Sequence, residues 1–235
     1  MKRLVMTGRV SSLKINASLL KNTVAAENQT RETFKIFENS NAEKRVLFLG
    51  NSITLHEKKA SIGWNVNWGM AASAEEKDYV HIVLKELKKK YGEISYCIAN
   101  ISKWERLYWE EDVIRKFSEA KDFNADTVIF RFGENIPRNS FEEYPLIEYL
   151  RKFVTYFTQR AQKVIITDMF WEYSDICDSL KRVARENGYE FVVISDLGYQ
   201  NENKAVGLFE CAAVAEHPGD LGMKRIAERI LEKFS

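Results

Sequence analysis

Cysteine is scarce in this sequence, and the arrangement of the few cysteines excludes two classes of protein. The 235 residues include three, Cys97, Cys177 and Cys211, and no two of them form a C-x-x-C pair. An odd number of widely separated cysteines fits neither a disulfide-stabilised scaffold nor a zinc site built on cysteine. We therefore expect three buried thiols in a protein from a reducing compartment.

An excess of charge is also absent. The chain carries 35 basic and 34 acidic side chains, which leaves a formal net charge of +1. Binding to nucleic acid or to an anionic membrane surface usually depends on a marked basic excess. The balance therefore argues against both of these partners.

Long apolar runs are missing as well. Residues 1–16 contain basic side chains, but Thr7, Gly8 and Arg9 interrupt the apolar positions, so the apolar core of a secretory signal is not present. No later segment approaches the run of about 18 apolar residues that a transmembrane helix needs. We expect a soluble, cytoplasmic protein, with loss of an export signal from this sequence as the alternative.

The sequence does contain a clear alternation of strand and helix patterns. Hydrophobic residues make up 45% of the chain, which is enough for one sizeable core. Five apolar runs, separated by helical patterns, predict buried strands at 46–49, 94–99, 127–131, 164–167 and 191–194. This order predicts an α/β domain with a five-stranded parallel sheet and helices on both faces. We expect the domain to span residues 41–235, with residues 1–40 as an N-terminal extension that packs on it.

The first predicted strand ends in a segment with two interpretations. Its apolar run stops at Gly50-Asn51-Ser52. Asn and Ser are favoured helix N-caps, so Ser52 is interpretable as the start of a helix. The carboxyl ends of parallel strands are also where α/β proteins bind ligands, so Ser52 is equally a candidate nucleophile.

A serine nucleophile needs a base, and the chain has only three histidines. His56 follows Ser52 closely in the chain and would have to fold back sharply to reach it. His81 belongs to a predicted amphipathic helix, where a structural role is the better interpretation. His217 lies in a Pro-Gly loop after the last predicted strand, at the same sheet edge as Ser52, and we expect it to be the base.

A polar segment, Gly133-Glu134-Asn135, follows the middle predicted strand. Asn135 is interpretable as a turn residue. Alternatively, its side-chain amide points into the same crevice as Ser52. In that case it donates to an oxyanion together with the backbone N–H of Ser52.

These segments together resemble the sequence blocks of the SGNH (GDSL-type) hydrolase family. The first block of that family reads G-D-S-[IL], and this chain has Gly50-Asn51-Ser52-Ile53 there. The G-x-N block is matched at 133–135, and the last block is matched by His217 in an H-P-x-D-x-G-M setting. The resemblance covers residues 45 to 233. It implies a flavodoxin-like three-layer α/β/α sandwich, a serine esterase mechanism through Ser52 and His217, and no metal or organic cofactor.

The resemblance also implies which residues surround the nucleophile. It places Asn51, Asn100, Ser102 and Gly133 around the oxyanion pocket, beside the donor Asn135. The second block of the family, N-x-G-x-x-G, differs here, because residues 100–105 read N-I-S-K-W-E and both glycines are replaced. A backbone N–H can come from a residue other than Gly, but the conformational freedom of Gly is lost.

A second departure concerns the histidine. The family has an aspartate three residues before it, and this chain has Val214 there. Valine cannot accept the ring N–H of His217, so another acceptor is needed. We rank a backbone carbonyl first, Asp196 second and Glu216 third. A Ser-His dyad is chemically workable, and a catalytically impaired, SGNH-like binding domain is the alternative.

The segment GWNVNWGMAAS, residues 63–73, connects the first predicted strand to its helix. Trp64, Asn67 and Trp68 suit contact with a sugar ring if they are exposed, whereas the two Trp side chains form a hydrophobic plug if they are buried. We expect the partner to be a small-molecule or glycan ester, such as a carbohydrate that carries an O-acetyl group. A lipid or thioester acyl group is the alternative substrate, and the sequence indicates no oligomeric state.

Overall fold

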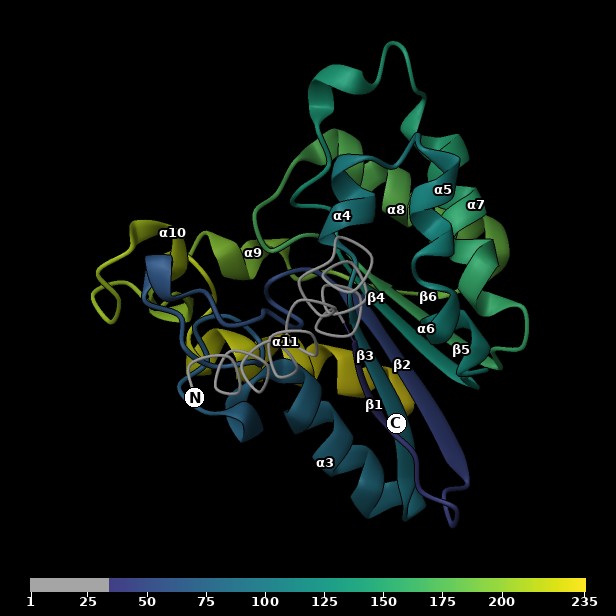
Figure 1. The fold of residues 1–235 in the computed structure, drawn as a ribbon, viewed down its shortest axis with the longest axis horizontal. Helices are drawn as coiled ribbons and strands as arrows, with labels where there is room; N and C mark the ends of the chain where they lie inside the picture. Colours follow the sequence, from purple (N-terminus) through teal and green to yellow (C-terminus); the bar gives the residue numbers. More distant parts are fainter. Residues whose placement is uncertain (1–33) are drawn as a thin grey trace, which may run out of the picture.

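A six-stranded sheet forms the centre of the fold (Figure 1). The structure, a computed structural model, describes residues 34–235. The strand order is β1-β3-β2-β4-β5-β6, and every neighbouring pair is parallel except β1 with β3. The strands are β1 (Phe34–Phe37), β2 (Lys44–Gly50), β3 (Ile94–Asn100), β4 (Thr127–Arg131), β5 (Lys163–Thr167) and β6 (Glu190–Val192).

All five predicted strands are present, and the sheet has one strand more than expected. β1 lies in the segment interpreted as an N-terminal extension and pairs antiparallel with β3 at the edge of the sheet. The predicted parallel five-stranded sheet is therefore corrected to a mixed six-stranded one. Residues 1–33 of the extension lie outside the described residues. The strand pattern of β1 is weak because the strand is four residues long and Ile36 and Phe37 are exposed.

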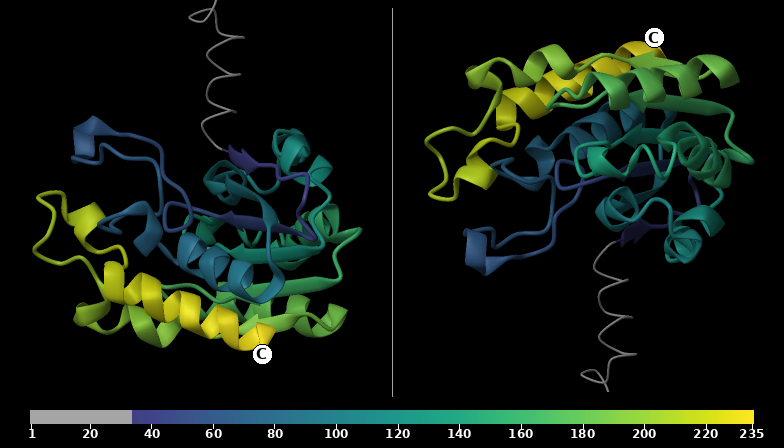
Figure 2. Two further views of the ribbon diagram at one scale, coloured as in Figure 1. Left: turned by 90° about the horizontal axis from the view of Figure 1, so that it is seen from below. Right: turned by 90° about the horizontal axis from the view of Figure 1, so that it is seen from above.

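Helices cover both faces of the sheet, which confirms the predicted α/β/α layers (Figure 2). One face packs against α3 (Tyr79–Tyr91) and α11 (Asp220–Leu231). The other face packs against α4 (Ser102–Arg106), α5 (Glu111–Arg115), α6 (Ser118–Asp122), α7 (Leu146–Thr158) and α8 (Ser174–Asn187). Between β6 and α11 lie α9 (Ser195–Gly198) and α10 (Ala212–Ala215). Short 3-10 turns occur at Ala60–Ile62, Glu75–Lys77, Arg138–Ser140, Asn201–Asn203 and Glu232–Phe234.

The cysteines agree with the sequence prediction in part. Cys97 and Cys177 are buried, whereas Cys211 is half-buried, so the expectation of three buried thiols is wrong for Cys211. Burial raises the pKa of Cys97 to about 12, which keeps this thiol protonated and unreactive.

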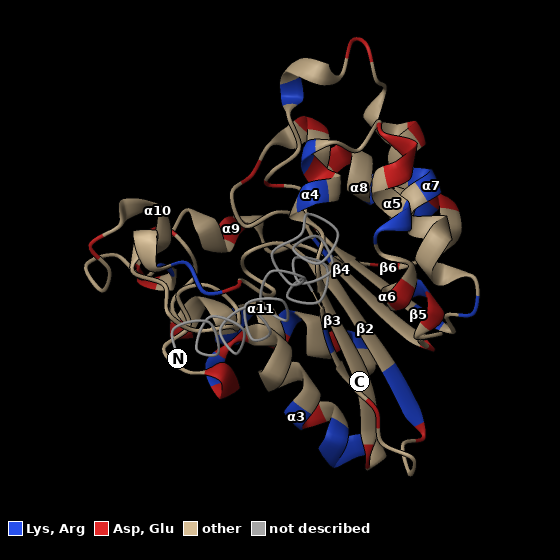
Figure 3. Cartoon of the chain, in the orientation of Figure 1, with Lys and Arg blue, Asp and Glu red and all other residues tan. Residues whose placement is uncertain are grey.

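Charged side chains of both signs are interspersed over the helices (Figure 3). Three consecutive basic residues, Lys88, Lys89 and Lys90, lie in the last turn of α3. Cations at this position are stabilised by the negative end of the helix dipole, so a structural reason accounts for them. None of the helices within residues 34–235 is both long and apolar enough to cross a membrane.

Candidate active site

Strands β2, β3 and β4, which precede the first, second and G-x-N blocks of the SGNH pattern, end at the same level of the sheet. Gly50, the last residue of β2, pairs with Asn100 on β3 and with Arg131 on β4. The residues that follow these strands therefore meet at the carboxyl edge, where open α/β sheets bind ligands. The loop after β2 and the segment with α10 project side by side from this edge (Figure 2).

Gly50 allows the tight turn that contains Ser52. A Cβ atom on Gly50 would lie 1.9 Å from Thr54 Oγ1 and 2.5 Å from the carbonyl oxygen of Arg131, so no other residue fits without a shift. The turn is closed by N–H groups that donate to the Asn51 carbonyl. Because a turn and no helix follows Ser52, its interpretation as a helix cap is wrong.

Ser52 and His217 are in direct contact. Ser52 Oγ lies 2.8 Å from His217 Nε2, although the two residues are 165 positions apart in the chain. Both side chains are half-buried. The expected pairing is therefore present, at a distance typical of a hydrogen bond.

The second ring nitrogen of His217 fixes the tautomer. His217 Nδ1 lies 2.7 Å from the carbonyl oxygen of Ala213. A carbonyl only accepts hydrogen bonds, so Nδ1 carries the proton and Nε2 is free to accept from Ser52. Burial lowers the pKa of His217 to about 4, against the opposing effect of the Ala213 hydrogen bond. The ring is therefore neutral at pH 7 and able to take a proton.

Neither of the two candidate carboxylates orients the ring of His217. Asp196 pairs with Arg229, with 2.7 Å between Oδ2 and Nη2. Glu216 pairs with Lys204 at 2.8 Å. The ring N–H of His217 donates to the backbone carbonyl of Ala213 instead, which is the kind of acceptor ranked first from the sequence.

The other two histidines have local partners. His56 Nδ1 lies 2.6 Å from the carbonyl oxygen of Glu57. His81 Nδ1 lies 2.8 Å from Asp78 Oδ1, at the start of α3, which agrees with the structural role expected for it. His217 is therefore the histidine that pairs with Ser52.

Val214, at the position of the family's aspartate, is part of a small apolar cluster. It is buried there with residues that include Trp64 and Ala205. The N–H of Ala205 donates to the carbonyl of His217 at 2.9 Å. The cluster thus joins the loop after β2 to the segment that carries His217, and holds the two parts of the candidate site together.

A charged network lies beneath the turn that holds Ser52. Asn51 is fully buried, and its Nδ2 donates to Glu105 at 3.1 Å and to Glu134 at 2.5 Å. Its Oδ1 accepts from Arg131 at 3.1 Å, and Arg131 also pairs with Glu134. Burial favours a higher pKa for Glu134, but the contact with Arg131 outweighs it and lowers the pKa. Asn51 therefore supports the turn from below, which corrects its predicted place in the pocket.

Glu105 connects this network to the third sequence block. It is fully buried and stands where the family's second block has its last glycine. Its Oε1 accepts the N–H of Gly133 at 2.6 Å, and its Oε2 accepts from Asn135 Nδ2 at 2.7 Å. The N–H of Gly133, which was predicted to lie around the oxyanion pocket, is thus engaged by Glu105 and is not available to an oxyanion. Sequence reasoning missed Glu105.

The fold is similar to that of several esterases of known structure. A two-domain esterase active on acetylated mannans aligns with a TM-score of 0.56 and 18% identity, over 81% of this chain and 49% of that one. The psychrotrophic esterase EstA from Pseudoalteromonas sp. aligns with a TM-score of 0.51 and 11% identity, over 82% and 97%. Axe2, an acetylxylan esterase from Geobacillus stearothermophilus, aligns with a TM-score of 0.50 and 18% identity, over 83% and 95%.

The chain has the SGNH hydrolase fold. Identities of 11 to 18% establish the fold alone. No protein-family model and no curated protein matches the sequence.

Two further residues that were predicted around the oxyanion pocket, Asn100 and Ser102, are engaged in other hydrogen bonds. Asn100 Nδ2 donates to the carbonyl of Leu55 at 2.6 Å, and the Ser102 N–H donates to Asn100 Oδ1 at 2.9 Å. These contacts shape the loop after β3, so the expected donation from this block to an oxyanion is corrected. The Ser52 N–H has no hydrogen-bond partner within residues 34–235. The side-chain amide of Asn135 has two N–H groups, of which one donates to Glu105 and the second remains for another acceptor.

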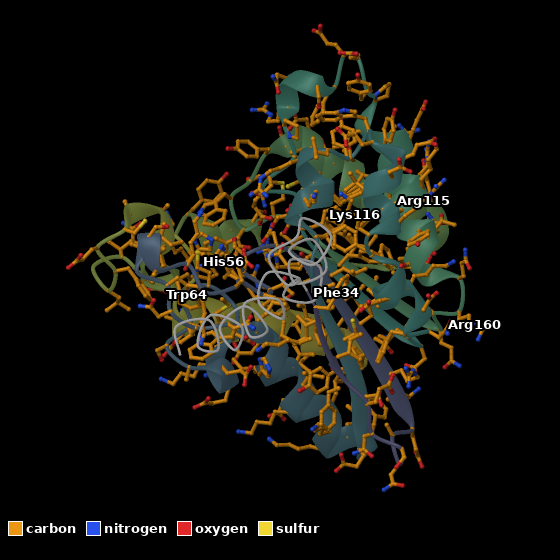
Figure 4. The ribbon with its side chains drawn as sticks, in the orientation of Figure 1. Phe34, His56, Trp64, Arg115, Lys116 and Arg160 are labelled. Atoms are coloured by element: carbon orange, nitrogen blue, oxygen red, sulfur yellow. The ribbon has the colours of Figure 1, made fainter. Side chains whose placement is uncertain are left out.

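Trp64 is a core residue of the loop after β2 (Figure 4). It is 2% exposed, its indole N–H donates to the carbonyl of His56, and its ring meets Trp68 edge-on with 6.0 Å between centroids. The hydrophobic plug is therefore the correct interpretation for Trp64, and the prediction that it contacts a sugar is wrong. Trp68 and Asn67 are half-buried, and their contact with a substrate stays a prediction.

Trp171 is a residue beside the candidate site that sequence reasoning missed. Its ring centre lies 4.9 Å from that of His217, and the two planes are inclined by 81°. The side chain is half-buried and follows β5, the neighbour of β4 in the sheet. An aromatic residue just after a predicted strand was the available signal for it.

Proposed function

We propose that the protein is a serine esterase with Ser52 as the nucleophile and His217 as the general base. The proposal depends above all on one chain of contacts: Ser52 Oγ to His217 Nε2 at 2.8 Å, and His217 Nδ1 to the carbonyl of Ala213 at 2.7 Å. The carbonyl selects the tautomer that takes the Ser52 proton, so a carboxylate is not required for that purpose.

In the first step, Ser52 Oγ attacks the ester carbonyl carbon while His217 Nε2 takes the hydroxyl proton. The carbonyl electron pair moves to oxygen, where the N–H of Ser52 and the free N–H of Asn135 stabilise the negative charge. When the tetrahedral intermediate collapses, the bond to the alcohol breaks and the alcohol leaves with the proton from His217. An acyl group is then bound to Ser52.

In the second step, His217 takes a proton from water as the water oxygen attacks the acyl carbon. The same donors hold the second oxyanion. The bond to Ser52 Oγ breaks, Ser52 recovers its proton from His217, and the carboxylic acid leaves.

The proposed dyad has a consequence for the rate. A neutral carbonyl at Ala213 stabilises the transient imidazolium less than the charged carboxylate of a triad does. Burial, which lowers the pKa of His217 to about 4, acts in the same direction. We therefore expect a slower turnover than that of a full triad, with a base that is active at mildly acidic pH.

We propose a short acyl group on a carbohydrate as the substrate. Of the esterases with a similar fold, one is active on acetylated mannans and another is an acetylxylan esterase. The half-buried Trp171 beside His217 supports this assignment, because an exposed aromatic face suits stacking against a sugar ring. Trp171 then has the role that the sequence suggested for Trp64.

Hydrolysis of p-nitrophenyl esters of increasing acyl length tests the proposal. We expect the acetyl ester to be cleaved fastest, with loss of hydrolysis in Ser52→Ala. Ser61→Ala, which changes an exposed serine of the same loop, is the matched control and should keep its activity. Preference for long acyl chains would favour the lipid or thioester alternative. Hydrolysis that persists in Ser52→Ala would contradict the mechanism, and no hydrolysis of any ester would favour a binding domain.

A further inference from the structure

Glu105 contacts both halves of the proposed site. Its Oε1 accepts from Asn51 Nδ2 at 3.1 Å, next to the nucleophile, and from the N–H of Gly133 at 2.6 Å. Its Oε2 accepts from Asn135 Nδ2 at 2.7 Å. The residue is fully buried, so solvent does not compete for these hydrogen bonds.

The orientation of the Asn135 amide is set from both ends. Its Nδ2 faces the carboxylate of Glu105, and its Oδ1 accepts from Arg106 Nη2 at 2.9 Å. A rotation of the amide by half a turn would place its oxygen against the carboxylate and its NH2 group against the guanidinium. Both contacts would become repulsive, so one orientation is favoured. In this orientation one N–H binds Glu105 and the second is left for another acceptor.

Packing fixes the short helix that carries Glu105. Trp104 on α4 is buried and stacks on Phe153 of α7, with 3.7 Å between ring centroids. The N–H of Ile101 donates to the carbonyl of Gly50 at 2.6 Å, which ties the start of α4 to the end of β2. Glu105 is therefore held at a defined position relative to the nucleophile turn.

The contacts of Glu105 favour its ionised form, because each group that contacts the carboxylate is a donor. Burial and the charge of Glu134 act against ionisation and hold the pKa of Glu105 above its ordinary value, although the N–H donors act in the opposite direction. The groups that contact the carboxylate, on Asn51, Gly133 and Asn135, are all donors. An amide of the same shape cannot accept from all of them, because its NH2 end would present hydrogen atoms to a donor.

We propose that Glu105 is the positioning residue of the oxyanion site, which holds Asn135 so that its free N–H is directed at the oxyanion. The inference rests on the proposed esterase function. Glu105 does not touch the reacting atoms and acts through Asn135. The SGNH pattern has a glycine at position 105, and in this chain the glutamate at that position orients Asn135 of the G-x-N block.

Glu105→Gln in the full chain tests the inference, because glutamine keeps the size of the side chain and removes its charge. One end of the glutamine amide must present its NH2 group to a donor, either Asn135 Nδ2 or the N–H of Gly133. We expect kcat for an acetyl ester to fall by about 10²–10³-fold, as when an oxyanion donor is removed. We expect KM to change by less than about threefold, because the lost interaction is made in the transition state.

A double-mutant cycle with Asn135→Ala separates positioning from general damage to the fold. If Glu105 acts through Asn135, Glu105→Gln lowers kcat strongly in the wild type and hardly at all in the Asn135→Ala background. Damage to the fold would give the same fractional loss in both backgrounds. The matched control is Glu111→Gln, which changes an exposed glutamate on α5 and should leave kcat unchanged.

Wild-type kcat in Glu105→Gln, or an equal loss in both backgrounds, would overturn the inference. If Glu105→Gln does not fold, Arg106→Met tests the same amide from its exposed end, and an unchanged kcat there would also overturn it. Ser52→Ala separates the two proposals. If Ser52→Ala still hydrolyses the ester, the esterase mechanism fails. If Ser52→Ala has lost hydrolysis and Glu105→Gln keeps the wild-type kcat, only the positioning role of Glu105 fails.

Discussion

Trp64 and Val214 are buried in the same apolar cluster, which joins the loop after β2 to the segment that carries His217. The SGNH pattern has an aspartate at position 214, as a partner of the histidine ring. Here an apolar side chain at that position anchors the histidine segment instead. The ring N–H of His217 donates to the carbonyl of Ala213, which the backbone supplies without any special residue type.

Restoring the aspartate should therefore not create a triad. Val214 has no exposed surface, so Val214→Asp places a carboxylate in apolar surroundings. We expect a lower melting temperature and no gain in kcat, measured by thermal unfolding and ester hydrolysis. Val214→Ala, which shortens the side chain without adding charge, should destabilise less. A Val214→Asp variant with wild-type stability and a higher kcat would show that position 214 can still orient His217.

The carboxylates of Asp196 and Glu216, which pair with basic side chains and not with His217, should be dispensable for hydrolysis. Asp196→Asn breaks the pair with Arg229, and Glu216→Gln breaks the pair with Lys204; both carboxylates are exposed. We expect each variant to keep most of its esterase activity and to lose no more than about 1 kcal/mol of stability. His217→Ala should abolish activity. A loss of several orders of magnitude in either carboxamide variant, with the fold intact, would reveal a displaced triad.

The pH dependence should follow the lowered pKa of His217. The base must be neutral, and burial lowers its pKa to about 4, so kcat/KM should rise with pH through about 4 and be level by neutral pH. The direction follows because protonation occupies Nε2 and removes the acceptor for the Ser52 proton. An acidic limb centred near the ordinary histidine value of about 6.5 would contradict the burial of this ring during the proposed reaction.

Much of this site was predictable because its residues directly follow strands with strong apolar patterns. Ser52 comes just after the run 46–49, and Asn135 lies shortly after the run 127–131. Since the ends of parallel strands share one edge of a sheet, the order of the blocks along the chain was enough to bring them together. The acceptor at Ala213 followed from chemistry, because every residue carries a backbone carbonyl.

The contacts of Glu105 and Trp171 were not predictable in the same way. Glu105 contacts Asn51 and Asn135, which are 54 and 30 positions away, and a single glutamate on a short helix gives no local signal for such contacts. The burial of Trp64 was equally hidden, since it depends on the distant Val214 and Ala205. A tryptophan between polar residues has the same appearance in a plug and in a binding surface.

Trp171 should affect glycan esters more than small esters. We expect Trp171→Ala to lower kcat/KM for an acetylated oligosaccharide by about tenfold more than for p-nitrophenyl acetate, because only the larger substrate loses a stacking partner. Trp171→Phe, which keeps an aromatic ring, is the matched control and should lose less. Equal losses on both substrates would argue that Trp171 only supports His217.

Labelling with a fluorophosphonate, followed by peptide mass spectrometry, tests the role of Ser52 most directly. The reagent forms a stable bond with a serine that an adjacent base activates. We expect a single adduct on the peptide that contains Ser52, absent in Ser52→Ala, retained in Ser61→Ala and formed much more slowly in His217→Ala. An adduct on a different residue, or no adduct under conditions in which the protein hydrolyses an ester, would contradict this role of Ser52.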